Sequence, residues 1–177
     1  MTPAPRSLVL IGPMGAGKSS IGRRVAKALG TTFYDSDTAI VRAHGPIERL
    51  FAEHGEERFR EIEHEAVRRG LALGGVVSLG GGAVLHADAP AALADHDVVL
   101  LTVSPRVVAG RIHDTSRPLL QAEDPVARWT EIYEARRPVY EQLADVVFDT
   151  SAGPLATVVR RVADWARERA DASEEVL

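Results

Sequence analysis

The sequence lacks cysteine and long apolar runs, and each absence excludes a class of protein. Without cysteine in its 177 residues, the chain has no disulfides, no thiol nucleophile and no cysteine-ligated zinc. No segment approaches the roughly 18 consecutive apolar residues of a membrane-spanning helix, and the first residues show no signal-peptide pattern. We therefore expect a cytoplasmic enzyme or binding domain that has no membrane partner.

An excess of one charge sign is also lacking. The formal net charge is -4, with acidic and basic residues mixed along the chain, which gives no reason to expect a nucleic-acid partner. The six histidines form no H-x-x-x-H pair, and aromatic residues make up 5% of the chain, so neither a zinc site nor a base-stacking surface is predicted. The length and the 45% apolar content predict one globular domain over residues 1–177.

Short apolar runs alternate with helical patterns along the chain. Such alternation predicts an α/β fold of three layers, in which helices cover both faces of a parallel sheet. Ligands bind beyond the carboxyl ends of such strands, where the segments GPMGAGKSS, DSD and GGG follow three of the runs. The predicted strands are 7–11, 32–34, 76–79, 97–103 and 146–148. The predicted helices are 20–29, 47–54, 57–73, one from about 105, 126–143 and 155–170, with a loop at 113–125 and a frayed tail at 171–177.

The segment GPMGAGKS at residues 12–19 fits the phosphate-loop pattern G-x-x-x-x-G-K-[ST] between a predicted strand and a predicted helix. Its glycines allow backbone N–H groups to surround phosphate oxygens. Lys18, one of two lysines against nineteen arginines, supplies a compact charge for the outer phosphates. Ser19 supplies a hydroxyl for Mg²⁺. We predict that this loop binds a nucleoside triphosphate; a glycine-rich turn without a ligand is the alternative.

Asp35 and Asp37 follow the second predicted strand, two residues apart. An extended backbone would point both side chains the same way, where they would hold Mg²⁺ through water and orient a substrate hydroxyl. The alternative is that Asp37 or Ser36 only caps the next helix.

Arg136 interrupts an otherwise apolar stripe of the helix predicted at 126–143. A guanidinium that points inward needs an anion, either a protein carboxylate or a substrate carboxylate, and the sequence leaves both open. Arg60 lies within helical reach of Glu56, Glu63 and His64, so by itself it indicates a surface ion pair.

Six segments in this order resemble the shikimate kinases, which belong to the nucleoside-monophosphate-kinase-like P-loop family. The resemblance extends from about residue 7 to 165 and consists of GPMGAGKSSIGRRVAKALG, FYDSD, GEERFREIE, SLGGGAV, SRPLL and ARRPVYEQLADVVFDT. It implies a five-stranded parallel sheet of the P-loop kinase type, an acceptor-binding segment at about 36–66 and a mobile lid at about 112–125. The implied activity is ATP-dependent phosphorylation of the 3-hydroxyl of shikimate, in aromatic amino-acid biosynthesis, by a monomer that uses Mg²⁺.

The resemblance also implies roles for individual residues. Lys18, Asp37 and Arg117 would be catalytic, with Arg117 in the lid. Ser19, and Asp35 through water, would hold Mg²⁺. The residues implied to bind ATP are Gly15, Ala16, Gly17, Lys18, Ser19, Ser20, Arg111, Arg117 and Pro154. The residues implied to bind shikimate are Asp37, Phe59, Arg60, Glu63, Gly80, Gly81, Gly82 and Arg136.

The sequence departs from the family pattern near the adenine contacts. The spacing between Arg111 and Arg117 is one residue shorter than in some relatives, and Ala152 stands near a position where relatives often have arginine. Two other functions remain open from the sequence: a kinase of the same fold with another small hydroxylated acceptor, such as gluconate or a nucleotide, and a nucleotide-binding module without catalysis.

Overall fold

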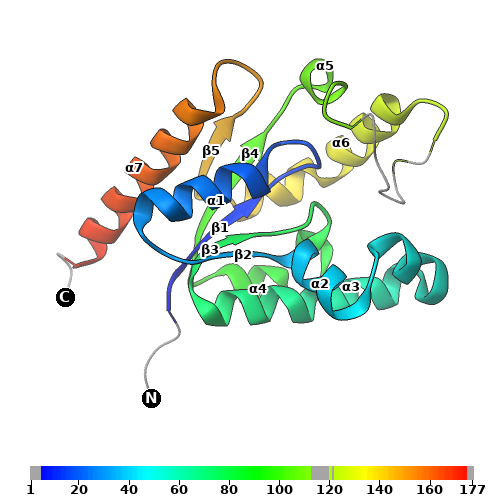
Figure 1. Ribbon diagram of the computed structural model, residues 1–177, viewed down its shortest axis with the longest axis horizontal. Helices are drawn as coiled ribbons and strands as arrows, with labels where there is room; N and C mark the ends of the chain where they lie inside the picture. Colours follow the sequence, from blue (N-terminus) through cyan, green and yellow to red (C-terminus); the bar gives the residue numbers. More distant parts are fainter. Residues whose placement is uncertain (1–4, 113–119, 121, 175–177) are drawn as a thin grey trace.

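The computed structural model describes residues 5–112, 120 and 122–174 (Figure 1). Five strands alternate with helices along the chain, as the sequence predicts. The strands are β1 (Ser7–Ile11), β2 (Phe33–Asp35), β3 (Gly75–Ser78), β4 (Asp97–Thr102) and β5 (Val146–Asp149). The helices are α1 (Lys18–Leu29), α2 (Ser36–His44), α3 (Ile47–Leu73), η1 (Ala83–Leu85, a 3-10 turn), α4 (Ala89–Leu93), α5 (Pro105–Val108), α6 (Pro125–Leu143) and α7 (Leu155–Glu174).

The strands form one sheet in the order β2-β3-β1-β4-β5, and all four neighbouring pairs are parallel. Because β1 lies at the centre, the loop that follows it is flanked by the segments after β3 and β4. The α/β fold with a five-stranded parallel sheet is therefore confirmed.

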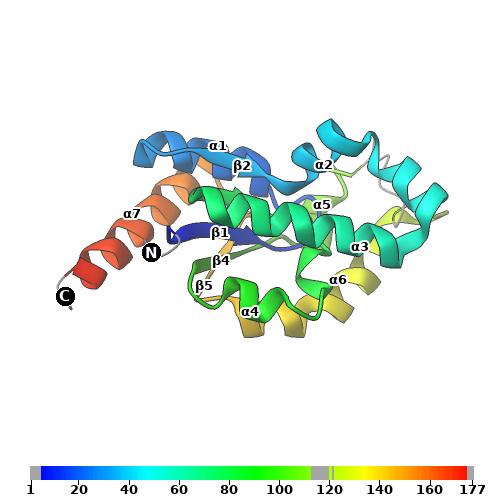
Figure 2. The ribbon, with the colours of Figure 1, turned by 90° about the horizontal axis from the view of Figure 1, so that it is seen from below.

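Alternate residues of the central strand face opposite layers of the core. Leu8 and Leu10 of β1 pack with residues of α1 and α7, whereas Val9 and Ile11 pack with residues of α3, α4 and α6. Figure 2 shows the same arrangement, with α1 and α7 on one side of the sheet and α4 and α6 on the other. The alternation in β1 thus produces two helix layers that enclose the sheet.

A third apolar cluster lies apart from both faces of the sheet. Its buried members come from α2 and α3, and Ile47 and Phe51 pack against it. These members are Ile40, Leu50, Phe59, Ile62 and Ala66. Helix α3 is interrupted at Gly55, which has a left-handed φ of 77°, so the separate helices predicted at 47–54 and 57–73 correspond to its two halves.

Three local predictions differ from the structure. Helix α7 extends to Glu174, so residues 171–174 are helical and not frayed. Helix α6 starts at Pro125, inside the predicted loop, because Asp124 caps it by accepting a hydrogen bond from the Ala127 N–H. The short η1 and α4 were not predicted, since three and five residues are too few to show a helical period.

Among the described residues, no helix combines the length and the apolar character that crossing a bilayer requires.

Candidate functional site

Two neighbouring cavities open beyond the carboxyl ends of the strands. The first, of about 320 Å³, lies at the phosphate loop and is called the loop cavity here. The second, of about 380 Å³, lies between α2, α3, the glycine segment after β3 and α6, and is called the helix cavity. Met14, Asp37 and Gly81 line both, so they form a shared wall.

The loop after β1 has the geometry of an anion-binding turn. Gly15 and Gly17 have positive φ angles of 80° and 90°, and Gly17 directly precedes α1. The Lys18 ammonium donates hydrogen bonds to the carbonyls of Gly12 (2.8 Å) and Pro13 (3.0 Å), which holds it over the loop.

The structure divides the predicted nucleotide-binding residues of this loop into two groups. Gly15, Gly17, Lys18, Ser19 and Ser20 line the loop cavity. The side chain of Ala16 is instead buried in the core, and only its backbone follows the loop.

Asp35 joins the loop to the start of α2. It is the N-cap of that helix, because one carboxylate oxygen accepts from the Thr38 N–H at 2.9 Å. Its other oxygen accepts a hydrogen bond from the Ser19 hydroxyl. The predicted capping role therefore belongs to Asp35, not to Asp37 or Ser36. The buried Ser36 hydroxyl instead accepts a hydrogen bond from the Gly80 N–H at 3.0 Å.

Asp37 lies in the first turn of α2, after the strand has ended. The sequence analysis expects an extended backbone to align Asp35 with Asp37. This expectation is wrong, because Asp37 is helical. Both side chains nevertheless line the loop cavity, and Asp37 also lines the helix cavity. The turn at the start of the helix brings them together.

Arg60 and Glu63 of α3 lie in the helix cavity as an ion pair. The Arg60 Nη1 is 2.7 Å from a Glu63 carboxylate oxygen, and its Nη2 is 3.2 Å from a carboxylate oxygen of the exposed Glu56. Glu63 is 2% exposed; burial raises the pKa of its carboxyl, and the Arg60 charge opposes this shift. The ion-pair interpretation of Arg60 is correct, but the pair lines a cavity instead of the open surface.

One polar atom of Arg60 is buried and unsatisfied. Within the described part of the chain, its buried Nε has no hydrogen-bond partner. The rings of Phe59 and Phe51 lie 5.3 and 5.9 Å from the Arg60 guanidinium and hold it in place. Arg60 therefore lines the cavity as a cation that its neighbours hold in place.

Arg136 reaches the same cavity from α6. Its side chain is buried, at 7% exposure, and it forms no ion pair with a carboxylate anywhere in residues 5–112, 120 and 122–174. It lies beside the hydroxyl of the buried Tyr140, whose pKa burial raises to about 12. The sequence leaves open a protein carboxylate or a substrate carboxylate as the partner of Arg136. No carboxylate of the described residues forms an ion pair with it.

The glycine segment after β3 allows side chains to approach its backbone. A Cβ on Gly82 would lie 2.3–2.5 Å from the Arg60 guanidinium, and one on Gly80 would lie 2.6 Å from an Asp37 carboxylate oxygen. A side chain at either position would displace these charged groups. Glycine therefore permits their present arrangement.

Arg111 also lines the loop cavity. Its guanidinium donates to the carbonyls of Gly15 (2.8 Å) and Thr150 (3.1 Å). Pro154 is exposed and lines neither cavity. Arg117 and most of the predicted lid at 112–125 lie outside the described residues.

Sequence reasoning missed several residues of the helix cavity. Ile47, Phe51 and Val41 form much of its apolar wall, and Met14 belongs to the shared wall. Ile47 and Phe51 are four residues apart on a predicted helix, which marks a common face but does not distinguish a core from a pocket.

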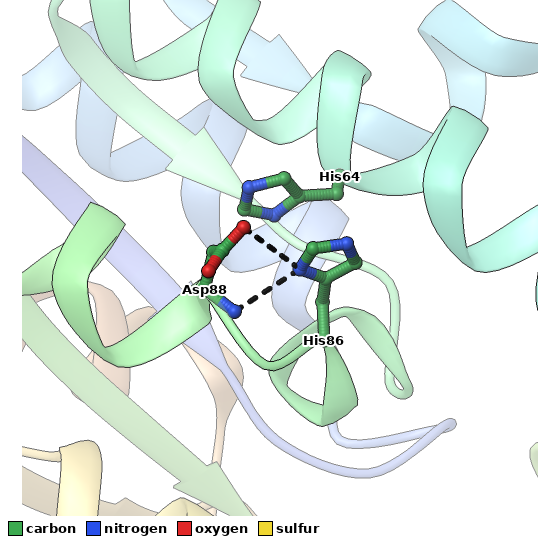
Figure 3. A group of neighbouring side chains, drawn as sticks. All are labelled: His64, His86 and Asp88. Carbon is green, nitrogen blue, oxygen red and sulfur yellow. Dashed lines mark hydrogen bonds and ion pairs between the residues drawn. The ribbon is translucent and has the colours of Figure 1, made fainter.

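A further group of titratable side chains lies outside both cavities, where α3 meets η1. The rings of His64 and His86 stack with centroids 3.8 Å apart and planes 3° from parallel, and Asp88 lies beside them (Figure 3). An imidazole ligates a metal along a lone pair in its ring plane. Two parallel planes share no point, so this stacked pair offers no common coordination position.

The parallel sheet, the phosphate loop and the adjoining charged cavity together define a P-loop kinase, and comparison with known proteins supports this class. The solved gluconokinase from Sinorhizobium meliloti shares the fold, with a TM-score of 0.65 and 26% identity over 97% of this chain and 98% of that one.

A more specific assignment comes from the family model for shikimate kinase, which matches residues 14–167. A shikimate kinase from Corynebacterium efficiens is 42% identical over 160 residues, covering 88% of this chain and 93% of that protein. The solved shikimate kinase from Acinetobacter baumannii, in complex with shikimate, has a TM-score of 0.88 and 31% identity over 93% of this chain and 94% of that one. The chain belongs to the shikimate kinase family.

Proposed function

We propose that this enzyme transfers the γ-phosphoryl group of ATP to the 3-hydroxyl of shikimate, with ATP in the loop cavity and shikimate in the helix cavity. The observation that carries the proposal is the shared wall: a phosphate loop and a cavity with two inward-facing arginines meet at Asp37. Phosphoryl transfer requires a donor and an acceptor that are held in contact and in line.

On the donor side, we assign the backbone N–H groups of Gly15, Ala16 and Gly17 to the ATP phosphates. The Lys18 ammonium exchanges its two carbonyl partners for the outer phosphate oxygens, whose negative charge it stabilises during transfer. Ser20 adds a hydroxyl at the cavity wall. Arg111 contributes to the adenine side, and the Pro154 backbone and the lid residue Arg117 are assigned to ATP on the family resemblance.

The contact between Ser19 and Asp35 suits a Mg²⁺ ion. A hydroxyl and a carboxylate at the mouth of the loop are the hard oxygen donors that this cation prefers. Ser19 would hold the ion directly and Asp35 through water. When bound, Mg²⁺ supplies positive charge that offsets the charge of the phosphates.

On the acceptor side, Arg136 and Arg60 would bind the carboxylate of shikimate. Arg136 lacks an ion-pair partner among the described residues, and the Arg60 guanidinium lines the same cavity. A planar carboxylate matches the paired donors of a guanidinium. Asp37, at the shared wall, would orient the 3-hydroxyl and accept its hydrogen bond.

The remaining acceptor contacts follow from the walls of the helix cavity. Phe59 and Glu63 hold Arg60, and the backbone of Gly80, Gly81 and Gly82 at the cavity wall would approach the ring of shikimate closely. We further propose that the enzyme acts as a single-domain monomer in the cytoplasm.

A coupled assay of ADP release tests the function. We expect turnover of shikimate, with gluconate and nucleoside monophosphates serving as acceptor controls at the same concentration. No ADP release from folded protein at millimolar shikimate would refute the proposal. Faster turnover of gluconate would favour the gluconokinase-like alternative, which the common fold suggests.

A further inference from the structure

Helix α6 binds the backbone of both segments that separate the two cavities. Met14 of the phosphate loop and Gly81 of the glycine segment line both cavities, and a Cβ on Gly81 would lie 3.5 Å from the Met14 backbone nitrogen. The two segments therefore lie next to one another, between the two cavities.

Two side chains of α6 donate hydrogen bonds to these segments. The indole Nε1–H of Trp129 donates to the Met14 carbonyl at 2.7 Å, and the hydroxyl of Tyr140 donates to the Gly81 carbonyl. Both side chains are buried, at 1% and 0% exposure. Both carbonyls belong to half-buried residues at the cavity wall, so each donor fixes the position of the backbone that it binds.

The helix supplies the spacing between these two donors. Positions 129 and 140 are eleven residues apart, which is about three helical turns, so they project from the same face. Tyr133 lies between them, with its ring 5.2 Å from that of Trp129 and 6.3 Å from that of Tyr140. This packed aromatic row holds the donors at a constant separation.

Arg136 projects from the same face of α6, between the two donors, into the helix cavity. Its Nη1 would lie 3.5 Å from a Cβ on Gly81. The helix thus fixes the phosphate loop, the glycine segment and an acceptor-facing arginine relative to one another.

We propose that Trp129 and Tyr140 are positioning residues for phosphoryl transfer, which set the distance between the two bound substrates without touching either one. The inference rests on the proposed function. Transfer requires reacting atoms about 3–3.5 Å apart and aligned, so a small shift of the wall lowers the rate more than it lowers the affinity for either substrate.

The test removes each donor but keeps an aromatic ring, as Trp129→Phe and Tyr140→Phe. Matched controls remove the same groups elsewhere: Tyr133→Phe on the same helix, and Trp165→Phe on α7. We expect kcat to fall about tenfold or more in each test variant, with the Kd of each substrate, measured separately by calorimetry, within about threefold of wild type. The controls should keep the wild-type kcat.

The double variant Trp129→Phe/Tyr140→Phe should lose less than the product of the two single effects, because both donors hold the same wall. An unchanged kcat in both single variants would overturn the inference. So would a loss confined to substrate affinity, or an equal loss of kcat in the controls. The wild-type rate with shikimate tests the proposed function by itself. The ratio of kcat between test and control variants tests this inference, and it is measured with whichever acceptor the wild type phosphorylates.

Discussion

The loop cavity and the helix cavity share a wall but are built in different ways. Half of the residues that line the loop cavity come from the continuous segment 14–20, whose backbone and Lys18 form the proposed anion site. The helix cavity takes its charged groups from α2, α3 and α6, and its two arginines are 76 positions apart in the chain. In the proposed arrangement, a phosphate, which is common to many substrates, would be bound by a local backbone motif. The acceptor would be recognised by side chains that only the complete fold brings together.

If this division is correct, a substitution at Lys18 should disable transfer and leave acceptor binding intact. Lys18→Arg places a larger planar cation in a loop fitted to an ammonium, and we expect kcat to fall by about 10³-fold. Lys27→Arg, at the other lysine, is the control because that side chain is exposed at the end of α1. A shikimate Kd that rises together with the loss of kcat would show that the two cavities are not separable.

The converse change is Arg136→Ala in the helix cavity. Loss of a buried charged contact should weaken shikimate binding by about 2–4 kcal/mol while the Kd of ATP stays within about twofold. Calorimetry with each substrate measures both values. Arg137→Ala is the neighbouring control, since Arg137 is exposed and paired with Glu141. Unchanged shikimate affinity in Arg136→Ala would remove Arg136 from the acceptor site.

A smaller effect should follow from Gly82→Ala. The added Cβ would meet the Arg60 guanidinium at 2.3–2.5 Å and force it to shift, so we expect the KM for shikimate to rise about tenfold. The KM for ATP should stay the same. Gly110→Ala is the control, because its added Cβ would make only an ordinary contact, with the Val107 carbonyl oxygen at 3.8 Å. Equal KM values for shikimate in the two variants would contradict the close approach of Arg60.

The same difference between the cavities determines how much the sequence could predict. The phosphate loop is a contiguous pattern, and Arg136 is visible because a charged residue interrupts an apolar stripe. Hydrogen bonds from Trp129 and Tyr140 to backbone carbonyls have no pattern of their own, because any residue provides a carbonyl. The position of Asp37 depends on the strand ending at Asp35, a boundary that local propensity does not determine to one residue.

The separate apolar cluster between α2 and α3 has a consequence for dynamics. Because it belongs to neither face of the sheet, α2 and the first half of α3 can lose their packing while both faces of the sheet remain intact. Such a local opening requires less free energy than global unfolding, and it would expose the amides of this segment to hydrogen exchange. A ligand in the helix cavity would contact Asp37 of α2 and Phe51 of the first half of α3 together with Arg136 of α6, so binding there also raises the free energy of this opening.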